Sequence, residues 1–486
     1  MSKRTSLFPS PRALLLSLVA LSGCASTSAE PGFRSVSATV QARTGRGLRW
    51  NRSTSDDEKV AQAVRSLLLK PLTAEGAMQI ALLRNAKLQA TYEELSLAQA
   101  DVVQAGLLSN PVFSATITTA ERDALDPNLI VGLTQSFLDL LLIPAKKKIA
   151  ASDFEQAKYR VASEVLDFAA RTKAAYFKVV AAEQSLAMRR AVAEVQQASY
   201  ELAERQRAAG GTSELAAMSE RALSGQTQLD LARAEAELNT SHEELTRLMG
   251  LWGAEVAWRS VDRLPEVPLA EPSLEHLESR AIAERLDLAA MRQEVQTLHY
   301  ALNLATTSRW TGILDIGADV ARLNDGRVVV GPRASIELPI FDQRQAPIAR
   351  LEAHLRAAER LLEARAIEVR SEVRDARNRL LYARAVIERY RGEIIPTREA
   401  LVFLSQQQYS AMLLGVYALI QVKQNEVNAY REYIEAVRDY WIARGDVEHA
   451  IGGALPVVDS GPAAPLPSPV PNGPPAPMSG EHHHPS

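Results

Sequence analysis

The chain lacks several features, and each shortage excludes a class of protein. Cys24 is the only cysteine among 486 residues, which excludes a fold held together by disulfides within one subunit. The net charge is only −3, which argues against a nucleic-acid partner. After the N-terminus, no segment approaches the ~20 consecutive apolar residues of a membrane-spanning helix. Contact with a membrane would therefore require a lipid, a β-barrel or both.

Catalytic and metal-binding patterns are also missing. Gly326 and Gly331 have the spacing of half a P-loop, but Pro332 and Arg333 stand where that motif needs Lys and Ser or Thr. The sequence therefore predicts neither an enzyme nor a resident cofactor. Five histidines are isolated, without metal-ligand spacing or a paired nucleophile: His242, His276, His299, His354 and His449.

Proline is absent between Pro144 and Pro265, and this gap predicts an unusually long helix. From Ala150 to Leu186, apolar and small residues recur at alternating spacings of four and three, which is typical of a coiled-coil seam. About 65 residues at ~1.5 Å each give a helix on the order of 100 Å long. The seam predicts shape and carries no chemistry.

Glycines end this helix and turn the chain back. Gly210 and Gly211 stop it, and Thr212 or Ser213 can cap the returning helix. A similar pattern starts at Pro347, with a predicted kink at Pro396 and a second turn near Gly415.

The N-terminus predicts export. A basic start and an apolar run from residue 13 to 20 precede Leu21-Ser22-Gly23-Cys24, which together form a secretory signal. The last four residues resemble the bacterial lipobox, after which the cysteine is lipidated and becomes the first residue. Ala25 stands where aspartate would be the usual signal for inner-membrane retention, and this resembles outer-membrane sorting. An ordinary exported protein with a chance cysteine is the alternative.

The two halves of the chain resemble each other. Residues 77–95 align with residues 278–295 at a shift of 200, as in the match of Leu88 with Leu288. Further along, Asp139 matches Asp342 at a shift of 203, and Gly211 matches Gly415 at a shift of 204. A nearly constant shift over a whole half indicates a tandem duplication. Each half is predicted to run as helix, two strands, long helix and helix.

The predicted strands alternate apolar and polar side chains. They cover about residues 111–120, 128–137, 313–322 and 327–338, and Asn324-Asp325-Gly326 is a turn signal between the last two. Strands of roughly ten residues have the length of transmembrane β-strands. A four-stranded sheet has two unpaired edges, which hydrocarbon does not tolerate, and the smallest membrane barrels use about eight strands. The sheet is therefore predicted to be completed by further copies of the chain. A soluble sandwich with the apolar face inside is the alternative.

Several stretches in this order resemble the TolC-like outer-membrane efflux proteins over residues 72–452. They are LLRNAKL, LLSNP, LPIFD and IIPTREALVFLSQQQYSAMLLGVYAL. The resemblance implies a mainly α-helical fold with a small β portion: a homotrimer whose twelve-stranded β-barrel in the outer membrane continues into a periplasmic α-barrel. It also implies a tripartite pump with a periplasmic adaptor (membrane fusion) protein and an inner-membrane transporter of the resistance-nodulation-division type.

On this fold, polar residues of the strands are expected to face a water-filled lumen and the apolar ones to face outer-membrane lipid. The expected pore-lining residues are Asp315, Asp319, Arg333, Glu337, Ser114, Thr116 and Thr118. Aromatic residues at the strand ends are expected to form a belt at the membrane surface: Phe113, Phe137, Trp310 and Phe341.

The sequence departs from the family at the expected periplasmic gate. In some members, aspartates six and nine residues after the tip glycine line the narrow mouth. Counted from Gly415, these positions are Gln421 and Gln424; the matching positions after Gly211 are Ala217 and Glu220. Three copies of Glu220 facing the pore would form an acidic ring that attracts cations. A solvated or intersubunit glutamate is the alternative.

The proline-rich C-terminus ends in residues that can bind soft or borderline metals: Met478, His482, His483 and His484. The segment from Tyr409 to Gln424 also resembles family members that accompany copper resistance. The alternatives for the tail are a chance histidine run or a cloning remnant.

The sequence thus predicts a lipid-anchored exit duct in the outer membrane that extends into the periplasm and conducts metal cations such as copper. A duct for drugs, other organics or secreted protein, and a periplasmic coiled-coil scaffold without a pore, are the alternatives. The predicted segments are a signal peptide (1–23), a lipidated tether (24–71), the first repeat (72–250), a linker (251–273), the second repeat (274–453) and a disordered tail (454–486).

Overall fold

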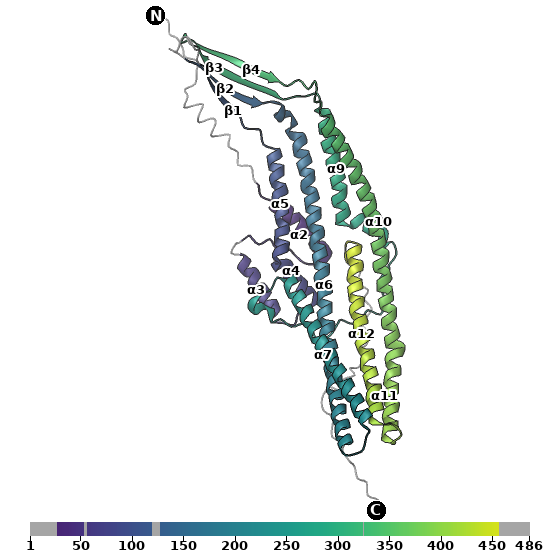
Figure 1. Cartoon of the computed structure of the whole chain (residues 1–486). Helices are drawn as coiled ribbons and strands as arrows, with labels where there is room; N and C mark the ends of the chain where they lie inside the picture. Colours follow the sequence, from purple (N-terminus) through teal and green to yellow (C-terminus); the bar gives the residue numbers. More distant parts are fainter. Residues whose placement is uncertain (1–26, 53–55, 119–126, 324, 456–486) are drawn as a thin grey trace, which may run out of the picture. The chain divides into compact units, whose positions relative to one another are not determined.

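The computed structural model describes residues 27–52, 56–118, 127–323 and 325–455. It contains two compact units, each built from both halves of the chain (Figure 1). The first unit comprises the described residues within 27–36, 92–161 and 289–363, and it includes the sheet. The second comprises the described residues within 37–91, 162–288 and 364–455, and it includes both turns between long helices.

The order of elements confirms the mainly helical, tandemly duplicated fold. None of the helices in the described ranges is long and apolar enough to cross a membrane. The first repeat contains α4 (Ala74–Arg84), α5 (Ala86–Ala105), β1 (Val112–Thr118), β2 (Asn128–Ser136), α6 (Leu138–Ala208) and α7 (Glu214–Met249). The second contains α8 (Leu277–Glu284), α9 (Leu286–Thr307), β3 (Leu314–Arg322), β4 (Val328–Ile336), α10 (Gln345–Arg389), the π-turn η2 (Tyr390–Ile394), α11 (Ile395–Ser410) and α12 (Val416–Ala450).

Shorter helices occupy the segments outside the repeats. The part of the chain expected to be a tether contains α2 (Glu30–Thr44) and α3 (Asp56–Leu68), and the linker between the repeats contains the 3-10 turn η1 (Gly253–Val256). The Ser, Thr and Arg content of residues 25–58 gave no signal for α2. Its helical state is explained by burial, because Phe33, Val36 and Val40 share one face of the helix and are all buried.

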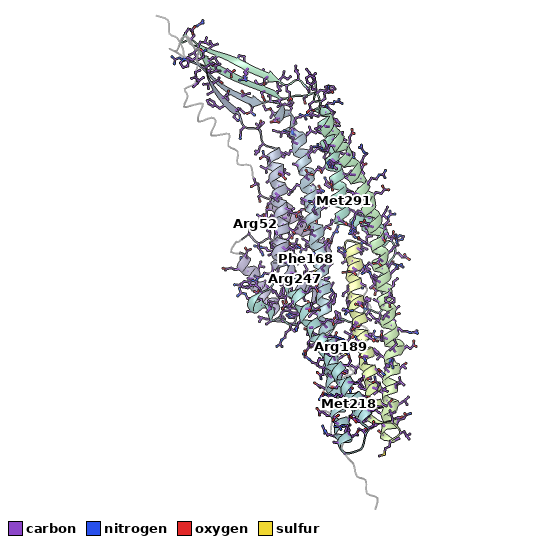
Figure 2. The ribbon with its side chains drawn as sticks, in the orientation of Figure 1. Arg52, Phe168, Arg189, Met218, Arg247 and Met291 are labelled. Atoms are coloured by element: carbon purple, nitrogen blue, oxygen red, sulfur yellow. The ribbon has the colours of Figure 1, made fainter. Side chains whose placement is uncertain are left out.

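The long helix predicted from the proline gap is α6, which covers 71 residues. Pro144 lies inside this helix beyond its first turn, so the carbonyl of Leu140 lacks its usual N–H partner in the helix. Of the predicted seam, Val161, Val165 and Val179 are fully buried, as is Thr172, and Phe168 is largely buried (Figure 2). Near Pro396 the α-helix gives way to the π-turn η2, which accommodates the hydrogen bond that proline cannot donate.

The four strands form one antiparallel sheet in the order β1-β2-β3-β4. The central pairing joins the repeats, because β2 of the first repeat lies beside β3 of the second, with Val131 opposite Val320. In the described residues β1 and β4 are the edges of this sheet.

Both repeats contain the same joint in the second unit. The helix pair at the start of each repeat breaks at one extended residue, Asn85 or Arg285, and the last helix of that repeat ends at a left-handed glycine packed against the break. Gly250 ends α7 with φ of 67°, and a Cβ there would lie 3.0 Å from the Arg84 carbonyl oxygen. Gly452 takes the same place after α12, with φ of 74°. A Cβ there would lie 3.3 Å from the Glu284 carbonyl oxygen.

The side chain at each break donates to carbonyl groups at the end of the last helix. Asn85 Nδ2 lies 3.0 Å from the Leu248 oxygen, and its Oδ1 accepts from the Leu88 amide at 3.0 Å. Arg285 Nη1 likewise reaches the Ala450 oxygen at 3.4 Å. These bonds satisfy backbone groups that a helix end leaves without partners inside the helix.

The second joint is held by charges as well. The Arg285 side chain is only 7 % exposed and pairs with Asp287 at 2.8 Å and Glu372 at 2.6 Å. Burial alone would raise the pKa of the Asp287 carboxyl, but hydrogen bonds from Arg285 and Arg365 outweigh burial and lower it. Arg43 of α2 adds bonds to the Gly452 and Glu284 oxygens at 2.8 and 2.7 Å.

We predict that Gly250→Ala lowers the free energy of unfolding by about 1–2 kcal/mol, because the new Cβ meets the backbone of Arg84 and the left-handed conformation disfavours alanine. Gly225→Ala, in the interior of the same helix with open space around it, is the control and should stabilise by up to about 1 kcal/mol. Thermal and urea unfolding followed by circular dichroism measures both. Equal stability of the two variants would contradict the packing assigned to the joint.

Candidate functional site

The sheet in the first unit collects the polar residues expected to line a pore. The pairing puts Ser114, Gly132, Asp319 and Gly331 in one row across the four strands. Because side chains alternate along a strand, residues two positions away lie on the same face. By this register one face carries Ser114, Thr116, Thr118, Asp315, Asp319 and Arg333, and Glu337 continues the alternation one residue beyond β4.

Charges and small residues organise this polar face. Arg333 Nη1 lies 3.8 Å from Asp319 Oδ2 on the neighbouring strand. A Cβ at Gly132 would lie 2.5 Å from Asp319 Oδ1 and 2.8 Å from Ser114 Oγ, so the glycine makes room for the carboxylate. The face therefore carries charged and hydroxyl-bearing side chains, and by the same register Ile130 and Val329 also lie on it.

The opposite face is apolar and exposed. Such a continuous apolar surface on one chain marks contact with a membrane or with other protein. Its exposed members are Phe113, Ile117, Leu129, Leu133, Ile316, Val320, Val328, Val330 and Ile336.

The aromatic residues expected to form a belt lie where strands meet helices in the first unit. Phe113 is the second residue of β1, and Phe137 follows β2 directly and donates its amide to the Leu314 oxygen at 2.9 Å. Trp310 precedes β3, and Phe341 follows β4. All four side chains are exposed, and their role as a belt stays a prediction.

The turns between the long helices, in the second unit, are equivalent residue by residue. In the first, Gly210 has φ of 74° and donates to the Arg207 oxygen; in the second, Met412 has φ of 60° and donates to the Tyr409 oxygen. Ser213 caps α7 by accepting from the Ala216 amide at 3.2 Å, as its position predicted.

The shift between these turns is 202 residues, so the predicted match of Gly211 with Gly415 is wrong by two. The match followed the identity of two glycines. The backbone instead pairs Gly210 with Met412, a methionine in the left-handed conformation that favours glycine. The positions six and nine residues after Gly210 are Ala216 and Ser219. The positions six and nine residues after Met412 are Ala418 and Gln421. Of these, Ser219, Ala418 and Gln421 are exposed.

Glu220, the residue of the predicted acidic ring, lies between helices of the second unit. It is 9 % exposed, and its Oε2 accepts from Gln196 Nε2 and Ser199 Oγ of α6, each at 2.8 Å. Gln424 Nε2 of α12 donates to Gln196 Oε1 at 2.5 Å, so one polar network joins the two repeats. A pore-facing Glu220 would have to leave these partners, and the ring stays a prediction.

A second link runs parallel to this network nearer the turns. Tyr417 donates its hydroxyl to Gln206 Oε1 at 2.8 Å. Burial and the negative charge of Glu220 raise the pKa of Tyr417. Along the hairpin of α6 and α7, Arg189 lies 3.9 Å from Asp230, and Met218 lies closer to the turn (Figure 2).

Some predicted site residues lie outside the described ranges, and two histidines have partners that the sequence did not indicate. Cys24 and the four residues of the tail, Met478, His482, His483 and His484, lie outside the described residues. Within the described ranges no group of three potential metal-ligating residues comes together. His449, which looked isolated in the sequence, lies 2.6 Å from Asp167, and the His242 ring stacks on Trp258 with centroids 4.1 Å apart. These partners are far away in the sequence and left no local signal.

Comparison with known proteins shows what this chain is similar to. Residues 77–251 match the family described as "Outer membrane efflux protein". Together with the fold, this match confirms the predicted resemblance to TolC-like outer-membrane efflux proteins.

Individual relatives support the same class. The cobalt-zinc-cadmium resistance protein CzcC of Cupriavidus metallidurans is 24% identical over 363 residues, which cover 72% of this chain and 80% of CzcC. The structure of CusC has a TM-score of 0.65 at 15% identity, covering 81% of this chain and 92% of CusC. The CmeC outer membrane channel of Campylobacter jejuni has a TM-score of 0.66 at 14% identity, covering 84% of this chain and 91% of CmeC. The structural likenesses establish the fold.

We predict opposite effects of exchanging the two left-handed residues at the turns. Met412→Gly should leave stability unchanged or raise it by up to about 1 kcal/mol, because glycine adopts positive φ without strain. Gly210→Met should lower the free energy of unfolding by about 1–2 kcal/mol. Met412 is 94 % exposed, so lost side-chain contacts do not obscure the comparison. Chemical denaturation measures the free energy of unfolding of both variants. A strong destabilisation by Met412→Gly would contradict the assigned turn.

Proposed function

We propose that the protein is the outer-membrane exit duct of a tripartite efflux system that conducts metal cations. Three copies would each contribute four strands to a twelve-stranded barrel, with the long helices continuing the tube into the periplasm. The duct is passive: a periplasmic adaptor and an inner-membrane transporter of the resistance-nodulation-division type would supply the substrate and the energy.

The observation that carries the proposal is the division of the sheet into two faces. One face holds the charged and hydroxyl-bearing residues, and the other holds exposed valine, isoleucine, leucine and phenylalanine side chains. A transmembrane barrel needs this arrangement, with its apolar side toward lipid and its polar side toward water.

The edges of the sheet support assembly from several chains. β1 and β4 leave one side of their backbone unpaired in the described residues, and hydrocarbon makes unpaired peptide groups costly. Symmetric copies can pair β1 of one chain with β4 of the next and so close the sheet. The fold likeness to CusC and CmeC is consistent with this assembly.

The substrate class is supported by the named relative. CzcC is a cobalt-zinc-cadmium resistance protein by name, and this chain aligns with 80% of its length. We therefore extend the substrate from copper, the cation predicted from the sequence, to divalent transition-metal cations. We further propose that Cys24 carries a lipid that anchors the N-terminus in the outer membrane, on the strength of the lipobox-like residues that precede it.

Adjacent valines of β4 provide the sharpest test of the duct. Val330 belongs to the apolar face and Val329 to the polar face, with 69 % and 50 % exposure. We predict that Val330→Lys reduces the heat-sensitive trimer and its ion conductance in planar bilayers, because a lysine facing lipid destabilises a transmembrane barrel, by about 2–4 kcal/mol at the bilayer midplane and by less toward its surfaces. Val329→Lys, which adds the same charge toward water, should retain both. Conductance equal in the two variants, or a monomeric wild type without conductance, would overturn the proposal and favour a scaffold.

The substrate is tested by growth of a deletion strain on graded cobalt, zinc, cadmium, copper and silver beside a panel of dyes and antibiotics. We expect metal sensitivity that the intact gene restores. Sensitivity to the organic panel alone would refute the metal assignment and leave a drug duct. A truncation that lacks residues 478–486 tests the tail, which contributes only if tolerance of one or more metals falls with it.

A further inference from the structure

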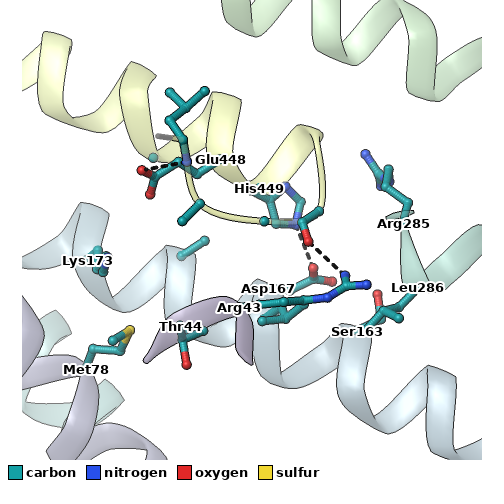
Figure 3. A pocket seen from close by; sticks show the side chains of 18 of the residues that line it. Arg43, Thr44, Met78, Ser163, Asp167, Lys173, Arg285, Leu286, Glu448 and His449 are labelled. Atoms are coloured by element: carbon teal, nitrogen blue, oxygen red, sulfur yellow. Dashed lines mark hydrogen bonds and ion pairs between the residues drawn. The ribbon is translucent and has the colours of Figure 1, made fainter. Parts of the chain in front are cut away.

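A hollow in the second unit has no part in the proposed duct. It lies beside α6 and the C-terminal end of α12, and Figure 3 shows one part of it, a cavity of about 410 Å³. Two neighbouring hollows of about 630 and 130 Å³ share lining residues with it. Ala170 lines all three, and Lys173 lines the first and the smallest. The three hollows therefore adjoin one another, and we refer to them together as the recess.

The recess combines apolar walls with a few charged groups. Met78, Leu286 and Leu455 line the cavity shown in Figure 3, and Phe177 and Trp441 line the smallest of the three hollows. The volume falls within the range of about 300–1,000 Å³ that is typical of small-molecule sites. Such sites join an apolar body to a small number of polar contacts that orient the ligand.

Most charges around the recess already have partners within the protein. Arg43 donates to two carbonyl oxygens, and Asp167 is paired with His449 at 2.6 Å. Arg285 is paired with Asp287 and Glu372, and Arg444 Nη1 lies 3.2 Å from Glu271. These groups shape the recess without being available to a ligand.

Among the cations that line the cavity of about 410 Å³, Lys173 is the exception. It is half-buried on α6, and no carboxylate of the described residues lies within ion-pair distance of its ammonium group. Figure 3 shows it apart from the cluster of Asp167, Arg43 and His449, on the same side of the recess as Met78. Glu75 and Glu448 line the recess near it but make no ion pair with it. A half-buried cation beside apolar walls favours a ligand with one negative charge.

We propose that this recess binds an anionic amphiphile, a medium-chain carboxylate, whose head pairs with the Lys173 ammonium group. Its hydrocarbon chain lies along Met78, Leu286 and Leu455. The ligand occupies the recess between α6 and α12, and it therefore bridges the first and second repeats close to the joint at Arg285. This binding does not depend on transport through the duct.

Trp441 provides the readout, since it lines the smallest part of the recess and stacks on Phe177 with centroids 5.7 Å apart. Full-length protein in lipid nanodiscs is titrated with decanoate, and tryptophan fluorescence is recorded for the wild type and for Trp441→Phe. The expected result is a saturable change in the wild type that is absent in Trp441→Phe. Decanol, which has the same chain without the charge, should bind at least fivefold more weakly.

Lys173→Gln should weaken decanoate binding about tenfold, as expected for loss of a charge-assisted hydrogen bond, while leaving the weak decanol response unchanged. Lys178→Gln, on the same helix but outside all three hollows, is the control and should bind like the wild type. Matching unfolding temperatures of the two variants exclude a folding defect. A non-saturable response, or equal decanoate affinity in the two variants, would overturn the proposal.

Discussion

The hydrogen-bonded ladder between β2 and β3 is the interaction on which the sheet depends. Each repeat supplies only a two-stranded hairpin, and an isolated hairpin is marginally stable in water. Pairing Leu129 through Ser136 with the strand of the other repeat makes one four-stranded sheet and fixes the register of both hairpins at once. A slip of one residue in this pairing would bring the face of Asp319 to the side on which the first hairpin carries Phe113 and Leu133. This pairing therefore places Asp319 of the second hairpin on the same face as Ser114 of the first.

Duplication preserved the backbone geometry of the joints while their chemistry diverged. A left-handed glycine against an extended break occurs in both repeats. The first joint uses the neutral amide of Asn85, whereas the second uses a buried guanidinium that must be compensated by Asp287 and Glu372. A buried charge costs more to dehydrate than an amide and needs more partners. Those partners come from α9 and α10, and Arg43 of α2 adds bonds of its own, so the second joint connects more of the chain.

Features that depend on periodicity were predictable, whereas features that depend on contacts between distant residues were not. The strands, their two faces, the seam of α6 and the Ser213 cap all have local signals of fixed spacing. The polar network around Glu220 has none, because Gln196, Ser199 and Gln424 come from two other helices. Helix α2 was missed because its composition is polar and only burial stabilises it. The equivalence of Gly210 and Met412 was hidden because one backbone conformation is occupied by two dissimilar residues.

The two turns also limit the symmetry of any ring built from this chain. A duplicated protein in a threefold assembly suggests six equivalent hairpin ends. Here one end has a glycine turn followed by a serine cap, and the other has a strained, highly exposed methionine followed by Gly415, which provides no side-chain cap. The two hairpin ends of one chain therefore offer different surfaces, one with hydroxyl groups and one with an exposed thioether.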